Sequence, residues 1–107
     1  MRMTGRKRKI IKMTLDEFKK SLTANEPQPG LDLPLQALWW EGKGEWHKAH
    51  ELCQQAGSHE GDRIHAYLHR VEGDDGNAGY WYARAGEPVF SGTLKEEWAH
   101  LVERYLK

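Results

Sequence analysis

The chain has 107 residues, a length typical of one domain, and its 16 Lys and Arg residues balance 16 Asp and Glu residues. Aromatic residues make up 10% of it, which argues against disorder throughout, because disordered chains are poor in aromatics. The one cysteine, Cys53, excludes an internal disulfide, and no apolar run approaches the roughly 20 residues that span a bilayer. We therefore expect a cytoplasmic protein with no membrane partner.

Residues 1–12 contain six Lys and Arg residues and no acidic residue. The remainder, residues 13–107, has 10 basic against 16 acidic residues and is expected to form one helical domain. We expect the basic tail to be disordered and Met13, where helical signals begin, to be the natural start. Because the acidic domain would repel a phosphate backbone, the sequence does not favour a nucleic-acid partner.

The first predicted helix spans residues 14–24. Thr14 and Glu17 form a capping box, in which each side chain accepts a hydrogen bond from the backbone N–H of the other residue. The following segment, residues 25–30, contains two prolines and is expected to end the helix. The apolar face of this helix consists of Leu15, Phe18 and Leu22.

Four further helices are predicted between Pro34 and Ala85, separated by segments that contain glycine. Pro34 suits the first turn of a helix, because its missing N–H costs nothing there. This helix is expected to begin at Pro34 and to end before Gly42. The other three expected ranges are 45–56, 62–72 and 76–85.

The last predicted helix spans residues 93–106. Thr93 and Glu96 form a second capping box at its start. Its apolar stripe, the clearest in the chain, consists of Trp98, Leu101, Val102 and Tyr105. No segment alternates between apolar and polar residues for long enough to form a sheet, so the predicted fold class is all-α.

The chain contains an internal repeat. A shift of 29 residues aligns two segments with the common pattern A-x6-G-[ED]-x3-A-x6-A. The aligned pairs are Ala37 with Ala66, Gly44 with Gly73, Glu45 with Asp74, Ala49 with Ala78, and Ala56 with Ala85. Small residues at these positions let two helices approach closely, and glycine followed by an acidic residue makes a turn that opens the next helix.

The repeat spacing resembles that of tetratricopeptide and Sel1-like repeats over residues 33–86, although the unit of 29 residues is shorter than the usual one of about 34. This resemblance implies two helical hairpins. The helices predicted over 14–24 and 93–106 would then be N-terminal and C-terminal capping helices.

Residues 65–86 read HAYLHRVEGDDGNAGYWYARAG, and residues 13–18 read MTLDEF. Both strings are similar to the signature of a bacterial family of small helical proteins. That resemblance supports Met13 as the start of the protein, and it implies no particular activity.

Histidines form the clearest candidate site for chemistry. His65 and His69 are four residues apart and share one face of their helix. If this helix packs antiparallel to the preceding one, His50 converges with them, and Glu51 or Glu72 could add a carboxylate. Such a group suits a metal site of three histidines, or of two histidines and one carboxylate.

A second interpretation of these histidines is that each forms hydrogen bonds across a helix seam. The HxxxH spacing lacks the internal glutamate of the HExxH zinc motif and is a weak signal by itself. The sequence therefore predicts no stoichiometric retention of zinc, iron(II) or nickel, and no cofactor.

Two aromatic residues, Trp40 and Tyr80, lie outside the apolar stripes of their helices. If they are exposed close to the histidines and Arg70, they mark a binding surface; otherwise they pack against the first helix or the tail. The candidate ligand- or partner-binding residues are Trp40, His50, His65, His69, Arg70 and Tyr80.

Enzymatic activity has little support in the sequence. Cys53 is predicted on a packing face, where a buried thiol is inert, and the glycine-rich residues 73–79 lack the Lys-Ser/Thr ending of a phosphate loop. The predicted function is a non-catalytic helical-repeat module that binds a protein partner or a small ligand. The alternative is a histidine-lined site for a metal or small molecule, with or without simple catalysis.

Overall fold

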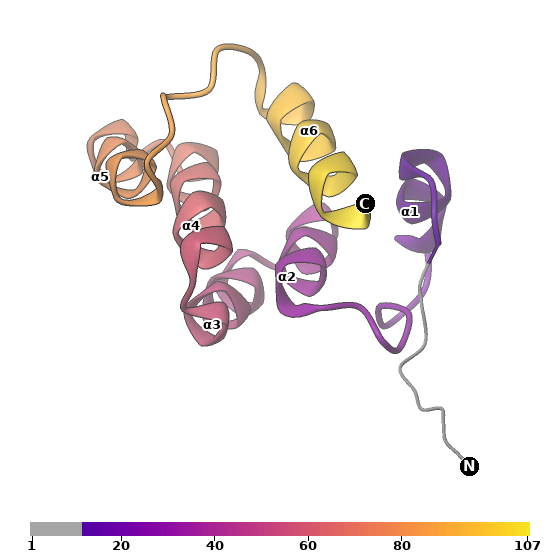
Figure 1. The fold of residues 1–107 in the computed structure, drawn as a ribbon. Helices are drawn as coiled ribbons and strands as arrows, with labels where there is room; N and C mark the ends of the chain where they lie inside the picture. Colours follow the sequence, from indigo (N-terminus) through magenta and orange to yellow (C-terminus); the bar gives the residue numbers. More distant parts are fainter. Residues whose placement is uncertain (1–11) are drawn as a thin grey trace.

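The computed structural model describes residues 12–107, which form six α-helices and no β-strand (Figure 1). The helices are α1 Leu15–Ser21, α2 Leu33–Gly42, α3 Trp46–Ala56, α4 His59–Val71, α5 Asp75–Ala85 and α6 Leu94–Leu106. The all-α prediction is confirmed for this part of the chain. The predicted basic tail lies, apart from Lys12, outside the described residues. None of the described helices combines the length and the apolarity needed to cross a membrane.

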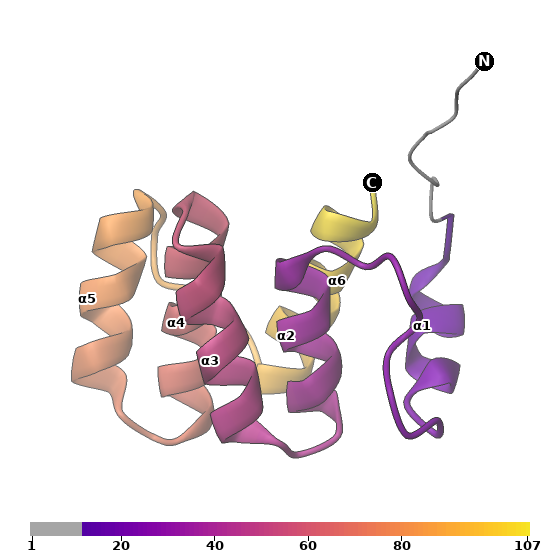
Figure 2. The same ribbon diagram turned by 90° about the horizontal axis from the view of Figure 1, so that it is seen from below.

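Helices α2 to α5 follow one another in a row (Figure 2). The most extensive packing is between α4 and α5 and between α2 and α3, and α3 also packs on α4. The chain then returns through α6, which contacts α2 and α4, while α1 lies against α6 at the end of the row far from α5. The row therefore places α3, α4 and α5 side by side at one end of the molecule.

Both predicted capping boxes are present. The Thr14 hydroxyl accepts from the Glu17 N–H at 3.1 Å, and the Glu17 carboxylate accepts from the Thr14 N–H at 2.9 Å. Thr93 and Glu96 form the same pair of bonds at the start of α6. Because these caps depend only on residues three apart, the sequence is sufficient to predict where α1 and α6 begin.

Two helix boundaries differ from the predicted ones by three residues, and the others differ by no more than one. α1 ends at Ser21 rather than residue 24, because the amides of residues 22–24 bond to carbonyls three residues back and tighten the final turn. α4 begins at His59, three residues before the predicted start at Asp62. Gly61 lies inside α4 rather than in the preceding turn, and the close approach of α3 explains why this position is glycine: a Cβ on Gly61 would lie 2.8 Å from the carbonyl oxygen of Cys53.

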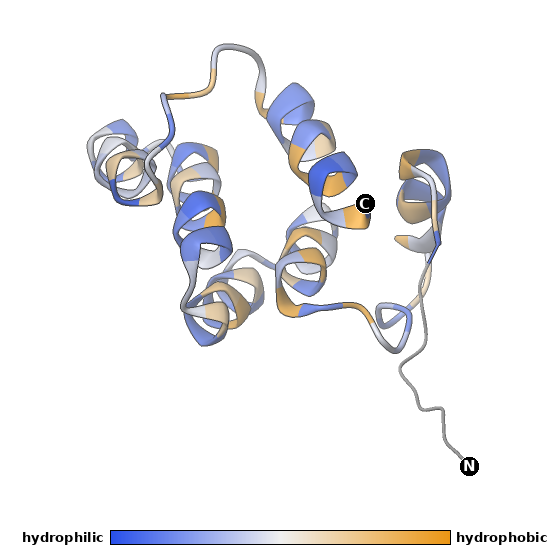
Figure 3. Cartoon of the chain, in the orientation of Figure 1, coloured by the Kyte–Doolittle hydropathy of each residue, from blue (hydrophilic) through white to orange (hydrophobic). Residues whose placement is uncertain are grey.

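The main hydrophobic core joins residues from α1, α2, α3, α4 and α6. Trp39 at its centre is fully buried, and its indole N–H donates to the Ser21 hydroxyl at 3.0 Å. The indole N–H of Trp98 donates to the Leu38 carbonyl at 2.9 Å, which ties α6 to α2. Figure 3 shows that α1 turns its hydrophobic side toward α6. A smaller cluster of Ala66, Ala78 and Tyr82 joins α4 to α5.

A buried ionic network, absent from the sequence-based predictions, connects α4, α5 and α6. Glu97 is fully buried, and its carboxylate forms an ion pair with Arg63 at 2.8 Å and accepts a hydrogen bond from Arg70 at 2.6 Å. The Tyr82 hydroxyl also donates to Glu97. Burial and the nearby Glu97 carboxylate raise the pKa of Tyr82 to about 12. This network connects the C-terminal helix α6 to α4 and α5.

The two turns that lie 29 residues apart share one backbone geometry. Gly44 and Gly73 have positive φ angles of 86° and 83°, where glycine is favoured. Glu45 adopts φ −95° and ψ 73°, and Asp74 adopts φ −98° and ψ 77°. In both turns the glycine N–H bonds to the carbonyl three residues back, and the acidic residue's N–H bonds to the carbonyl five residues back.

Five of the six alanines at matching positions of the two segments are buried, and Ala56 is half-buried. Ala37, Ala49 and Ala66 are fully buried, and Ala78 is only 2% exposed. We expect Ala78→Leu to lower the free energy of unfolding by about 1–3 kcal/mol, because the larger side chain overpacks the contact between α4 and α5. Urea unfolding followed by circular dichroism measures the loss.

Gly79→Ala is the matched control for Ala78→Leu. Gly79 is the next residue of α5, and a Cβ placed there has no atom within 4 Å. Because alanine is a better helix former than glycine, this change should be neutral or stabilising by up to about 1 kcal/mol. If Ala78→Leu unfolded at the urea concentration of the wild type, α4 and α5 could not pack as described.

Candidate functional site

A cleft of about 470 Å³ lies where α3, α4 and α5 meet. The side chains that give it its chemical character are those of His50, Cys53, Asp62, His65, His69 and Trp81. α3 supplies the first two, α4 the next three and α5 the last. The site therefore depends on the packing of three consecutive helices.

Three imidazole rings converge in this cleft. The ring centroids of His50 and His65 are 4.7 Å apart, those of His50 and His69 are 5.6 Å apart, and those of His65 and His69 are 6.0 Å apart. His65 and His69 are one turn apart on α4, and His50 reaches them because α3 packs on α4. His65 and His69 are buried, and His50 is half-buried.

The His65 ring is held through its Nδ1 atom. This nitrogen lies 3.2 Å from the Gly61 carbonyl oxygen and 3.3 Å from Cys53 Sγ. The Cys53 thiol itself donates to the Gly61 carbonyl at 2.8 Å. Because a carbonyl oxygen only accepts, Nδ1 carries the proton, and Nε2 of neutral His65 keeps its lone pair.

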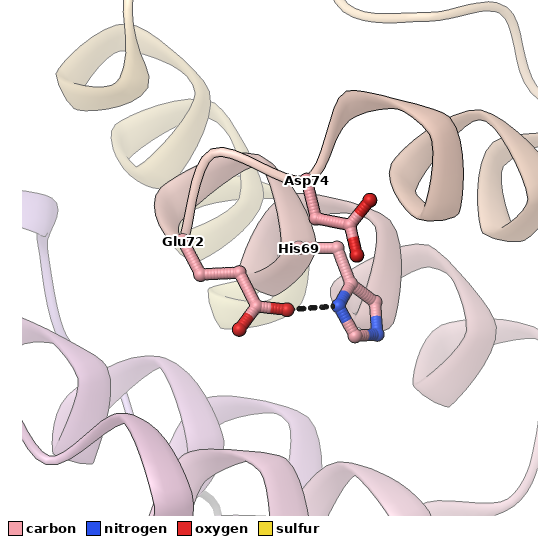
Figure 4. A group of neighbouring side chains, drawn as sticks. All are labelled: His69, Glu72 and Asp74. Carbon is pink, nitrogen blue, oxygen red and sulfur yellow. Dashed lines mark hydrogen bonds and ion pairs between the residues drawn. The ribbon is translucent and has the colours of Figure 1, made fainter.

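The His69 ring is held in a similar way by an acidic residue (Figure 4). Its Nδ1 donates to the Glu72 carboxylate at 2.6 Å. The Asp74 carboxylate lies close by and accepts from the Asn77 N–H at 3.1 Å, which caps α5. Among residues 12–107, His69, Glu72 and Asp74 are the one group of three potential metal ligands whose donor atoms all lie within 4.8 Å of one another.

Tryptophan rings support two of the histidines. The imidazole of His65 stacks on the indole of Trp81 with centroids 4.0 Å apart and planes 12° apart. The imidazole of His50 stacks on Trp46 at 4.8 Å and 11°. The Trp46 N–H donates to the Leu68 carbonyl at 2.7 Å, which fixes this indole against α4. The histidine rings are thus oriented by packing as well as by hydrogen bonds.

The surroundings favour uncharged groups in the cleft. Burial lowers the pKa of His50 and of His65, and the positive charge of a neighbouring imidazolium lowers each further. Burial, together with the Asp62 carboxylate, raises the pKa of the Cys53 thiol to about 12. At neutral pH the cleft therefore presents the neutral imidazoles of His50 and His65 and a protonated thiol, which is a poor nucleophile.

Three of the six candidate binding residues lie outside the cleft. Trp40 packs edge-on against Trp39, and the Lys48 ammonium lies 4.0 Å from the centre of its ring. Arg70 is bound to Glu97 of the ionic network. Tyr80 is 55% exposed.

The cleft also contains residues that the sequence analysis did not select. Trp81 is half-buried and forms one wall of the cleft. Asp62 lies there too, with its carboxylate 3.6 Å from Arg84. Asn77 and Trp81 are four residues apart on α5 and therefore share the face of this helix that lines the cleft. This spacing is the one signal in the sequence that links Trp81 to the cleft.

Comparison of the chain with protein-family models, with curated proteins and with solved structures finds no match. The resemblance to a bacterial family of small helical proteins stays a prediction. The function is therefore inferred from the geometry of the cleft and from the chemistry of its residues.

Proposed function

We propose that this chain is a non-catalytic binding module in which two helical hairpins of the tetratricopeptide and Sel1-like kind hold a small ligand. The hairpins are α2–α3 and α4–α5, and α1 and α6 are the capping helices. The observation that carries this proposal is the convergence of His50, His65 and His69 beside Trp81 in one cleft.

The hairpin assignment is supported by the two matching turns. Gly44 and Gly73 have nearly the same φ angle, and the residues that follow them have nearly the same φ and ψ. The two pairs α2–α3 and α4–α5 are also the most extensively packed pairs of helices, and α3 packs on α4. Stacking of one hairpin on the next is the general architecture of such repeats.

The dimensions of the cleft favour a small ligand over a protein partner. Its volume of about 470 Å³ lies within the usual range for small-molecule sites, roughly 300–1,000 Å³. Polar groups converge in it beside an aromatic wall, as is typical of such sites. Two of the aromatic or charged residues considered for a partner surface, Trp40 and Arg70, are engaged within the protein instead.

The chemistry of the cleft favours binding over nucleophilic catalysis. Its one sulfur, Cys53, is 1% exposed, and burial raises its pKa to about 12, so the thiolate is not formed near neutral pH. Neutral imidazoles offer one donor and one acceptor each, and Trp81 offers a flat surface. A small ligand with a planar or lone-pair-accepting group suits this set.

Fragment binding followed by NMR tests the proposal. Isotope-labelled protein is titrated with planar fragments that carry a hydrogen-bonding group, namely nicotinamide, uracil and benzoate. We expect at least one of them to shift the indole signal of Trp81 and the ring signals of His65, because the cleft offers both a stacking face and polar partners. Trp81→Leu should abolish these shifts.

Tyr80→Ala is the matched control, since Tyr80 is the preceding residue of α5 and lies outside the cleft. This variant should bind the fragments as the wild type does. Shifts scattered over the surface, or shifts that persist unchanged in Trp81→Leu, would show that the cleft is not the ligand site.

A further inference from the structure

We infer that the cleft binds a divalent first-row transition metal ion, such as Zn²⁺, through the Nε2 atoms of His50, His65 and His69, with one position left open to water or another small molecule. This inference rests on the proposed function, because it names the ligand of the same cleft. Three neutral nitrogen ligands and one open position are a common arrangement for a zinc ion that exchanges a ligand.

The ring centroids are spaced as around a single ion, although the ring nitrogens of the three histidines do not all lie within 4.8 Å of one another in this arrangement. A tetrahedral ion at about 2.0–2.1 Å from each Nε2 would lie about 3.2 Å from each ring centroid and would hold the centroids about 5.2 Å apart. The observed centroid separations of 4.7, 5.6 and 6.0 Å lie around that value. An ion could therefore be bound by rotation of the imidazole rings, without movement of α3 relative to α4.

Two of the rings already have the second hydrogen bond that supports a metal-binding histidine. A metal-bound histidine usually donates its other ring N–H to a carbonyl or a carboxylate, which fixes the ring and the tautomer. His65 donates Nδ1–H to the Gly61 carbonyl, and His69 donates Nδ1–H to the Glu72 carboxylate. Within residues 12–107, no protein group forms a hydrogen bond with Nε2 of either ring. Two buried imidazoles that line one cleft thus have Nε2 atoms without a protein partner among the described residues.

His50 is the adjustable member of the group. Its ring forms no hydrogen bond within the described part of the chain and is held by stacking on Trp46. It is also the least buried of the three. Rotation of this one side chain would aim its lone pair at an ion held by His65 and His69.

The structure changes the expectation drawn from the sequence, which was that no metal would be retained. That expectation depended on the weakness of an isolated HxxxH spacing. The third imidazole from α3 and the two Nδ1 bonds are tertiary features that the spacing does not contain. They supply the additional ligand and the supporting partners that a metal site needs.

A second arrangement near the cleft would use Nδ1 of His69 with the carboxylates of Glu72 and Asp74 (Figure 4). We favour the three imidazoles because these acidic groups already have partners. Asp74 accepts from the Asn77 N–H at the start of α5, and Glu72 accepts from His69. An ion bound there would displace the Glu72 hydrogen bond and compete for the cap of α5.

Metal retention distinguishes these arrangements. Protein without a histidine tag is mixed with one equivalent of Zn²⁺ and desalted, and the zinc that remains is measured by mass spectrometry. We expect about one ion per chain in the wild type and less than about one tenth in His50→Ala, His65→Ala and His69→Ala, because three ligands are required for tight binding. Glu72→Gln should weaken binding about 10- to 100-fold, as expected for loss of a residue that orients a ligand.

Two variants are matched controls. His47 is an exposed histidine on the same helix as His50, so His47→Ala should retain zinc as the wild type does. Asp74→Asn keeps a side chain that caps helices well, and it should also retain zinc. Circular dichroism shows whether each variant is folded. The visible spectrum of the Co²⁺-loaded wild type, expected to have the intense bands of four-coordinate cobalt, is a readout that needs no variant.

Each other outcome has one meaning. Loss of zinc in Asp74→Asn and Glu72→Gln, with retention in His50→Ala and His65→Ala, would replace the three-histidine site by the acidic arrangement. No retention in the wild type, with fragments still bound at Trp81, would overturn the metal inference and leave the proposed function standing. If the wild type bound neither zinc nor the fragments, both the metal inference and the proposed function would be overturned.

Discussion

Replacing Glu97 with alanine is expected to lower the free energy of unfolding by about 3–5 kcal/mol. The Glu97 carboxylate is fully buried and is bound to Arg63 at 2.8 Å and to Arg70 at 2.6 Å. Its removal leaves the Arg63 guanidinium, 2% exposed, with only its ion pair to Glu87 at 3.0 Å, and takes from Arg70 its carboxylate partner; breaking a buried ion pair in this way is costly. Urea unfolding at pH 7 measures the loss.

Glu103→Ala on the same helix is the control for the Glu97 variant. Glu103 is exposed, so its replacement should change the free energy of unfolding by no more than about 0.5 kcal/mol. If Glu97→Ala cost less than about 1 kcal/mol, the buried network could not be what holds α6 on α4 and α5.

Trp39→Ala is expected to cost a similar amount, about 3–5 kcal/mol. Trp39 is fully buried, and its removal leaves a large cavity and frees the Ser21 hydroxyl from the indole N–H. Trp40→Ala is the matched control, because Trp40 is the neighbouring residue of α2 and is only half-buried. Its replacement should cost less than half as much. Equal losses, or a larger loss for Trp40, would mean that α2 turns a different face toward the core.

Local signals were enough to predict most of the helices. The caps at Thr14 and Thr93 depend on residues three positions away, so both are visible in the sequence and both are present. The start of α4 was placed too late because Gly61 resembles a residue of the preceding turn. Only the packed structure shows that this glycine is helical and that the Cys53 carbonyl leaves no room for a side chain.

The buried ionic network could not be predicted from the sequence. Glu97 is four residues from Leu101, on the face of α6 that turns toward α4, but a glutamate in the first turn of a helix is ordinarily exposed. Its burial depends on Arg63 and Arg70, which are 34 and 27 residues away along the chain. The sequence does not show that Arg70 and Glu97 are close in space. Arg70 was therefore considered a binding residue, whereas the structure pairs it with Glu97.

The candidate site was partly predictable. The four-residue spacing of His65 and His69 placed them on one face of a helix, and His50 joined them once the two helices were taken to pack together. The sequence could not show which ring nitrogen of each histidine is occupied. That depends on the positions of the Gly61 carbonyl and the Glu72 carboxylate in three dimensions.

The tautomers of the histidines test the central claim most directly, because a ligand lone pair at Nε2 requires the proton to be on Nδ1. Long-range ¹H–¹⁵N spectra of the imidazole rings, recorded at pH 8 without metal, distinguish the two forms. The bonds to Gly61 and Glu72 predict that His65 and His69 carry the proton on Nδ1. The proposed metal site predicts that their Nε2 signals shift when one equivalent of Zn²⁺ is added. Protons found on Nε2 of both rings, with no change on addition of zinc, would contradict a ligand-binding role for these histidines.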